Sequence, residues 1–271
     1  RYVYKKHSGP AASRNVGILL SRGEYVAFLD HDDLWLPDNL TNKVNLLREN
    51  PSCGMVYSYP KLISASGEHI PNDPPSWFPD GPGAFKYFLQ KNRIVTFSSV
   101  VVRKEVFRIV GLLDDRDEVK TCDDYDLWLR ISDIFPIAFD PNMNTCYRIH
   151  DGNLINDYDK NFNAHLFVYK KALSICKTAR SLPSQERRRI VRNHLHQHYR
   201  LFAYRYYYMK HDVPTARRLL LMALRLKPSP LIDWIRLAFL LSPPPLRVAI
   251  QHLRRKKRAG QAPDGNQAPH P

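Results

Sequence analysis

Hydrophobic and polar positions follow two different patterns along this chain. Up to about residue 150, short apolar runs of strand length alternate with segments whose apolar residues recur at helical spacing. Strands are expected over residues 25–29, 54–58, 94–102, 137–139 and 145–149, and helices over 38–50, 84–90 and 123–133. Strands and helices in alternation predict an α/β fold built on a layered sheet.

The helix expected over residues 38–50 has a recognisable start and a predicted inner face. Asp38, a residue type that caps helix N-termini, directly follows Pro37. Leu40, Val44 and Leu47 recur at helical spacing and are expected to face the core. A stretch rich in Pro, Gly and Asp over residues 66–83 predicts a long loop, a feature that is often functional in a compact domain.

From about residue 160 onward the pattern is helical throughout. Helices are expected over 161–177, 185–209, 214–226, 231–241 and 246–257, separated by prolines. The last residues are rich in Gly, Pro, Gln and Asn, which predicts a disordered tail. The expected parts are therefore an α/β domain over 1–152, a basic helical region over 153–259 and a tail over 260–271.

Charge divides the chain in the same place. Residues 1–160 carry a net charge of −3 and residues 161–271 carry +18, within a total of +15. Basic clusters at Arg187–Arg189 and Arg254–Arg258 suit an anionic membrane or nucleic acid. No nucleic-acid-binding module is visible, so nucleic acid is not an expected partner. Residues 231–241, which include Trp234, suit an interfacial helix, although a solvated face on a helical bundle is the alternative.

Two further features concern the cellular setting. No run approaches eighteen uncharged apolar residues, so no membrane-spanning helix is expected. The four cysteines, at positions 53, 122, 146 and 176, show neither metal-finger spacing nor the density of a disulfide framework. Scattered thiols of this kind fit a reducing compartment, and a cytoplasmic protein is expected.

An acidic cluster follows the strand expected over residues 25–29. Asp30, Asp32 and Asp33 fall within four positions, and three carboxylates this close repel one another unless a cation offsets their charge. A divalent metal ion that also binds a diphosphate would supply that cation. The alternative is a solvated turn in which Asp33 caps the next helix.

Five segments in a fixed order resemble one enzyme family, the family-two glycosyltransferases of the GT-A fold. The acidic cluster lies in the second segment, at the position of the family's DxD region. The matching segments are Ser13–Gly17, Ser21–Pro37, Ser98–Arg103 with Val110–Gly111, Asp123–Arg130 and Tyr147–His150. The resemblance covers roughly residues 8–150 and implies a nucleotide-diphospho-sugar transferase fold that is followed by an all-helical region.

The resemblance also implies roles for residues near the acidic cluster. Asp32 is similar to the carboxylate that ligates Mg²⁺ or Mn²⁺, and Asp30 to one that supports the metal or the ribose of the donor. Asp33 would be a third member of this set. Arg14 and Asn15, expected in a loop that leads into a helix, are similar to donor-binding residues, with a surface arginine as the alternative.

A second acidic pair is implied to carry the proton transfer. Asp124 is similar to the general base that takes a proton from the acceptor hydroxyl, and Asp123 stands where the family usually has Glu. A helix cap is the alternative for this pair. His150 is a candidate ligand of the metal or the diphosphate, or a bystander.

The function implied is inverting transfer of a sugar from a nucleotide-sugar donor to a glycan or lipid-linked acceptor. The protein is expected in the cytoplasm, with peripheral contact to an anionic membrane. The resemblance also implies base-binding elements upstream of Arg14, so the chain is expected to lack the N-terminal end of the fold and to show weak or no activity alone. The alternatives are a non-catalytic remnant or partner subunit, and a membrane or nucleic-acid adaptor that acts through its basic region.

Overall fold

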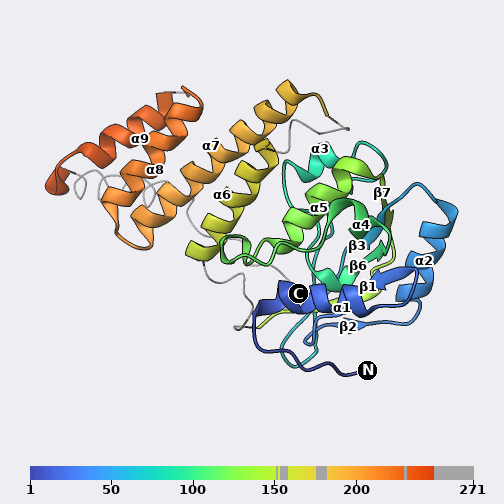
Figure 1. Cartoon of the computed structure of the whole chain (residues 1–271). Helices are drawn as coiled ribbons and strands as arrows, with labels where there is room; N and C mark the ends of the chain where they lie inside the picture. The colour runs from blue at the N-terminus through green and yellow to red at the C-terminus, as the bar shows by residue number, and fades with distance from the viewer. Residues whose placement is uncertain (151, 153–157, 175–181, 229–230, 247–271) are drawn as a thin grey trace, which may run out of the picture. The chain divides into compact units, whose positions relative to one another are not determined.

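The computed structural model describes residues 1–150, 152, 158–174, 182–228 and 231–246 (Figure 1). The chain forms two compact units, Arg1–His194 (unit 1) and Leu195–Pro271 (unit 2). The predicted α/β fold is confirmed in unit 1, which holds all the strands of the described residues. The units divide within a helix, whereas the sequence pattern changes near residue 152, so the predicted domain limits stay a prediction.

The main sheet of unit 1 is built from four short strands. They are β1 (Tyr25–Ala27), β3 (Met55–Ser58), β6 (Val100–Arg103) and β7 (Ile137–Asp140), in the spatial order β1-β6-β3-β7. Strand β6 is antiparallel to both β1 and β3, whereas β3 and β7 are parallel. Strand β1, which leads into the acidic cluster, is therefore an edge strand of this sheet.

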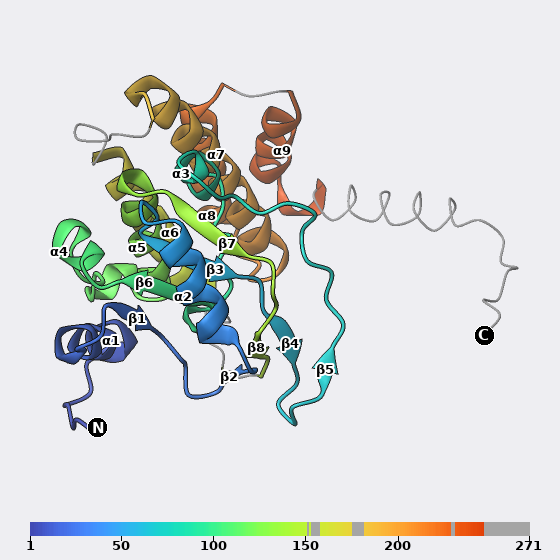
Figure 2. The same cartoon turned by 90° about the vertical axis from the view of Figure 1, so that its right-hand side faces the viewer.

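Helices cover both faces of the main sheet. Figure 2 shows α2 (Asn39–Glu49) on one side, with α5 (Asp123–Ile134) and α6 (Tyr158–Ser174) on the other. Buried apolar side chains join α2 to the sheet, namely Leu47, Cys53, Val56, Val101 and Ala138. On α5, Leu127, Trp128 and Ile131 have no exposed surface. Both faces are apolar, as expected for a sheet between two helical layers.

A second, smaller sheet holds the segments that flank the acidic cluster. Its strands are β2 (Leu34–Trp35), β8 (Thr145–Arg148), β4 (Lys61–Ile63) and β5 (His69–Ile70), in the order β2-β8-β4-β5. Strands β2 and β8 are antiparallel, with Leu34 opposite Cys146. Because Asp33 precedes β2 and His150 follows β8, this pairing brings both ends of the predicted site together.

The remaining elements of unit 1 include two helices that the sequence pattern did not indicate, α1 (Gly9–Leu20) and α4 (Val106–Val110). The others are α3 (Ala84–Phe88) and short 3-10 turns at Phe97–Ser99 and Asp117–Val119. Arg14 and Asn15 were expected in a loop, and that expectation is wrong because both lie inside α1. A proline in the first turn favours a helix that begins there.

The strand predicted over residues 94–102 is wrong in its first half. Strand β6 begins only at Val100, and Phe97–Ser99 form a 3-10 turn. Thr96 Oγ1 accepts a hydrogen bond from the Ser98 N–H at 3.2 Å, and Ser99 Oγ donates to the Thr96 carbonyl at 2.8 Å. Local bonds from hydroxyl side chains to the backbone compete with a strand ladder, and here they replace it.

Helix α2 begins where predicted, but the residues that face the core differ from the predicted ones. Asp38 occupies the N-cap position with φ 66°, and its side chain makes no capping hydrogen bond. The buried residues are Asn39, Lys43 and Leu47, whereas Leu40 is exposed. Lys43 Nζ is buried because it bonds Asn39 Oδ1 at 2.5 Å and lies 3.6 Å from Asp140 Oδ2. A buried ion pair decides the rotation of this helix.

The helical part of the chain is close to the sequence pattern. Helices α7 (Ser184–Tyr208), α8 (Val213–Leu226) and α9 (Leu231–Leu241) agree within one residue with the predictions. Asp212 caps α8 by accepting the Thr215 N–H at 3.0 Å. No helix among the described residues is long and apolar enough to cross a membrane. The predicted helix over 246–257 lies almost wholly outside the described residues, as does the predicted tail over 260–271.

Candidate functional site

The end of strand β1 is tied to α1 and α5 through a single arginine. Arg14 Nη2 donates to Asp30 Oδ1 at 2.6 Å, and Arg14 Nη1 lies 3.5 Å from Asp123 Oδ2. The guanidinium also lies 4.0 Å from the ring centroid of Phe97, a cation–π contact. The two acidic clusters that the sequence singled out, near residues 30 and 123, therefore belong to one site.

Asp123 and Asp124 open helix α5. Asp123 is buried, while Asp124 is partly exposed and accepts a hydrogen bond from Asn92 Nδ2 at 3.1 Å. Asp124 Oδ1 also accepts the Tyr125 N–H at 2.6 Å. Asn92 is fixed in turn, because its Oδ1 accepts the Ile94 N–H at 3.1 Å. The side chain of Asp124 is thus held at the surface of the site.

The two carboxyls at the start of α5 have unusually high pKa values. Burial, together with the neighbouring Asp124, raises the pKa of Asp123 to about 7 in spite of Arg14. Burial raises the pKa of Asp124 to about 6, although the Tyr125 N–H and Asn92 favour its charged form. Carboxyls so close together share their protons, so these pKa values belong to the pair. A pKa near neutrality suits a group that must accept and release a proton.

Asp32 forms a pair with His150. Asp32 Oδ2 lies 3.0 Å from His150 Nε2, and His150 Nδ1 accepts the Gly152 N–H at 3.1 Å. The ring proton therefore resides on Nε2 and points at Asp32. Partial burial opposes the charge on Asp32, but the hydrogen bond with His150 and the nearby imidazoles outweigh it, so the pKa of Asp32 is lowered.

Asp32 and His150 have the chemistry of metal ligands, although the described residues contain no group of three or more His, Cys, Asp or Glu side chains that could hold a metal. Both side chains are partly exposed, at 24% and 30%. Mg²⁺ is usually bound by one or two carboxylates, with water and substrate phosphates as its other ligands. The pair fits such an ion, because a metal that binds here would replace the proton between the two side chains.

Asp33 has a different environment from its neighbours. It is buried, its Oδ2 accepts from Thr96 Oγ1 at 2.8 Å, and its Oδ1 accepts the Arg148 N–H at 3.0 Å. Burial raises the pKa of Asp33 in spite of these hydrogen bonds. Both carboxylate oxygens therefore serve the fold, and Asp33 anchors the turn that presents Asp32.

Asn15 is also used internally. Its Nδ2 donates to the Leu113 carbonyl at 2.9 Å, and its Oδ1 accepts the Leu113 N–H at 2.9 Å. This two-point bond fixes the loop between α4 and α5 to helix α1. Asn15 thus lies next to the predicted donor-binding residue Arg14, but it acts on the backbone.

The geometry adds three residues that the sequence reasoning did not assign to the site. Asn92 holds Asp124, as described above. Ser98 Oγ accepts the Asp30 N–H at 2.9 Å, and Arg148 Nε donates to the Asp32 carbonyl at 2.8 Å. Ser98 and Arg148 lie in segments that resemble the family, but nothing in the pattern around Asn92 marks it.

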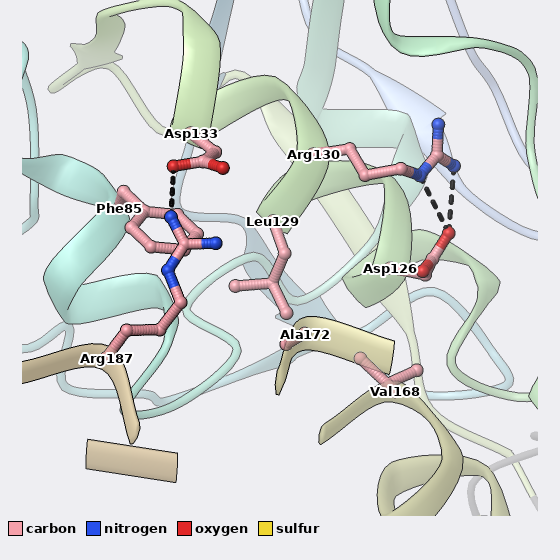
Figure 3. A pocket seen from close by; sticks show the side chains of 8 residues that line it. All are labelled: Phe85, Asp126, Leu129, Arg130, Asp133, Val168, Ala172 and Arg187. Carbon is pink, nitrogen blue, oxygen red and sulfur yellow. Dashed lines mark hydrogen bonds and ion pairs between the residues drawn. The ribbon is translucent and has the colours of Figure 1, made fainter. Parts of the chain in front are cut away.

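A small cavity of about 20 Å³ lies along another part of α5 (Figure 3). Arg187 closes one side, where its buried guanidinium donates to Asp133 Oδ1 at 2.5 Å and lies over the Phe85 ring. Arg130 and Asp126 form an ion pair on the other side at 2.9 Å. The cavity has room for about one water molecule. Its lining belongs to the packing of α5 and includes none of the predicted site residues.

Comparison with known proteins identifies the class of protein. Residues 1–176 match the model of glycosyltransferase like family 2, so the chain belongs to this family. An uncharacterised glycosyltransferase of Rickettsia felis is 27% identical over 152 residues, which are 55% of this chain and 25% of that protein. The putative teichuronic acid biosynthesis glycosyltransferase TuaG of Bacillus subtilis is 26% identical over 171 residues, 62% of this chain and 63% of that protein.

Solved structures show the same fold. Residues 1–349 of TarS from S. aureus, solved in complex with UDP-GlcNAc, match with a TM-score of 0.58 at 15% identity, over 83% of this chain and 63% of that one. The mannosyltransferase PcManGT of Pyrobaculum calidifontis, solved with GDP-Man and Mn²⁺, matches with a TM-score of 0.50 at 16% identity, over 86% of this chain and 59% of that one. These likenesses confirm the predicted GT-A-type fold. The chain spans a quarter to a half of the length of the Rickettsia relatives.

Proposed function

We propose that this protein transfers a sugar from a nucleotide-diphosphate donor to a hydroxyl of a glycan or lipid-linked acceptor, with Asp124 as the general base. One observation carries the proposal. Arg14 contacts both Asp30 and Asp123, so the strand-end carboxylates and the α5 pair face one site although 93 residues separate them. Family membership supports the reaction class, and the donors named for the two solved neighbours support a nucleotide sugar.

The proposed proton transfer uses the pair at the start of α5. Asp124 takes the proton from the acceptor hydroxyl as that oxygen attacks the anomeric carbon and the bond to the diphosphate breaks. Asn92 holds the carboxylate toward the acceptor, and burial raises the pKa of Asp124. Asp123 lies beside it and contacts Arg14. A base with a pKa of about 6 is mostly charged at neutral pH and still binds a proton well enough to take it.

The leaving diphosphate requires positive charge on the opposite side of the site. Arg14 provides one permanent charge, and Asp30 fixes its direction. Asp32 and His150 would hold Mg²⁺ or Mn²⁺, with Asp30 nearby, and the ion would stabilise the charge that develops on the diphosphate. We assign Asp33 and Asn15 to positioning, since their polar atoms are bonded within the fold.

The setting we propose is cytoplasmic, with peripheral contact to an anionic membrane where a lipid-linked acceptor would be available. The three described cysteines are buried free thiols, which suits a reducing compartment. The excess of basic residues after position 160 suits an anionic surface.

Calorimetric titration tests the donor site directly. UDP-, GDP- and dTDP-sugars are titrated, in the presence of Mn²⁺, into the wild-type chain and into the Asp32→Ala variant. The variant Asp115→Ala, which changes an exposed carboxylate, is the matched control. The expected result is metal-dependent binding by wild type and Asp115→Ala that is lost in Asp32→Ala. The reason is that Asp32 is a partly exposed carboxylate paired with His150, and both side chains can ligate a metal ion. Absence of binding by every donor would reject the proposal for this chain and favour the non-catalytic alternative.

A further inference from the structure

Helix α9 of unit 2 has two apolar faces, and only one of them is used inside the unit. Its inner face buries Leu237 and Leu240, each 5% exposed. On the opposite side, Leu231 is 74% exposed, Trp234 51%, Ile235 46% and Leu241 58%. At about 100° per residue these four side chains fall within one half of the helix. They are called the outer face of α9 below.

The core of unit 2 is complete without this outer face. Helix α8 contacts α9 and contributes a set of buried side chains, namely Ala216, Leu219, Leu220, Ala223 and Leu224. Phe239 also packs within the unit, with its ring 5.5 Å from that of Tyr207. Exposing four large apolar side chains on one short helix is unfavourable in water, so the outer face is expected to have an apolar partner.

The exposed charges in the described part of unit 2 all have one sign. In the described part of unit 2, every exposed charged side chain is basic: Lys210, Arg218, Arg225, Lys227 and Arg236. Asp233 is fully buried and forms ion pairs with Arg200 and Arg236, and Asp212 is partly buried at the cap of α8. The whole sequence of unit 2 carries 14 Lys and Arg against 3 Asp and Glu.

We propose that the outer face of α9 inserts into the interfacial layer of an anionic lipid bilayer. Aliphatic side chains and a tryptophan favour that layer, and the exposed cations of unit 2 gain from anionic headgroups. A second copy of the chain is a poorer partner, because two strongly basic surfaces repel each other. The proposal rests on the membrane contact in the proposed function and adds the surface that makes it.

Vesicle sedimentation tests the proposal without any transferase assay. The full chain is mixed with vesicles of phosphatidylcholine alone, or of phosphatidylcholine with phosphatidylglycerol, and the bound fraction is measured. The double variant Trp234→Gln with Ile235→Gln removes half of the outer face. The matched control is Leu19→Gln, which removes an apolar side chain 67% exposed in unit 1. Far-UV circular dichroism checks that each variant is folded.

The expected result is binding to the phosphatidylglycerol vesicles, unchanged in Leu19→Gln and reduced by about tenfold or more in the double variant. No binding to either vesicle, or equal binding by wild type and the double variant, would overturn the proposal. Analytical ultracentrifugation provides a second criterion: a dimer that the same double variant dissociates would show that a second copy covers the face. Sugar-donor titrations are independent of all these outcomes, so failure here leaves the donor site unaffected.

Discussion

Several charged side chains of unit 1 are buried in specific pairs, whereas in the described part of unit 2 the exposed charged side chains are all basic. Lys43 and Asp140 in unit 1 have no exposed surface, and Arg187 is 1% exposed beside Asp133. Unit 2 buries Asp233 in a similar way, but it also exposes five cations and an apolar face of α9. The same residue types therefore perform different tasks in the two units.

This difference teaches what each arrangement of charge can do. A buried pair is directional and poorly screened, so it can hold a charged side chain such as Arg187 in one geometry. Exposed cations are screened within about 8 Å at physiological salt, so they favour a whole anionic surface and not one geometry. The contrast predicts that substitutions in unit 1 change chemistry or stability, while substitutions on unit 2 change binding to a surface.

The largest expected effect is on catalysis, from Asp124→Asn. The amide keeps the size of the side chain but cannot accept the proton, so the rate of sugar transfer should fall by roughly 10² to 10⁴. Single-turnover transfer measures the loss, and calorimetry should show unchanged donor binding. Asp115→Asn, at an exposed position of the loop before α5, is the control. A greater loss in Asp123→Asn than in Asp124→Asn would instead identify Asp123 as the base.

The second effect is on stability and depends on pH. The folded pKa of Asp123 is about 7, above its ordinary 3.8, so the folded chain binds more protons than the unfolded chain between those limits. Stability from this group is present at low pH and decreases as pH rises through about 7. Asp123→Asn removes the charge, so at about pH 8 it should raise the free energy of unfolding by roughly 1–2 kcal/mol.

Urea unfolding of wild type and Asp123→Asn across this pH range measures that difference. The gain should disappear below about pH 4, where the wild-type carboxyl is protonated in both states. A variant that is less stable than wild type at high pH would contradict the prediction. It would mean that the ion pair with Arg14 outweighs the burial of Asp123.

The smallest effect on stability is expected from the exposed cations of unit 2. Arg218→Gln combined with Arg225→Gln should change the free energy of unfolding by at most about 0.5 kcal/mol, because exposed charges contribute little to the fold. Urea unfolding checks this value, and donor titration should also be unchanged. The salt dependence of vesicle binding should weaken in the same variant. A large loss of stability would show that these arginines belong to the packing, as in unit 1.

The local sequence pattern determined much of the secondary structure and of the distribution of charge. The alternation of strands and helices, the helices α7 to α9 and the basic character of the C-terminal half follow from residue spacing and composition. The acidic cluster after β1 was also visible, because three neighbouring carboxylates are conspicuous in any context. Such features depend on residues close together in the chain, which is the range over which periodicity and capping act.

Only the tertiary structure decided what the carboxylates do. Asp33 is buried because Thr96 and Arg148 bond it from 63 and 115 residues away, while Asp32 meets His150 from 118 residues away. Equivalent neighbours in sequence thus obtain opposite environments and opposite pKa shifts.

The rotation of α2 and the role of Asn92 were decided in the same way. Lys43 would be assigned to the surface by its residue type, and its partner Asp140 lies in the distant strand β7. Asn92 has no distinguishing pattern until the fold brings it to Asp124. Hydrogen bonds and ion pairs between distant segments leave no periodic pattern in the sequence. They depend on which segments the fold brings together, and not on the neighbours of each residue along the chain.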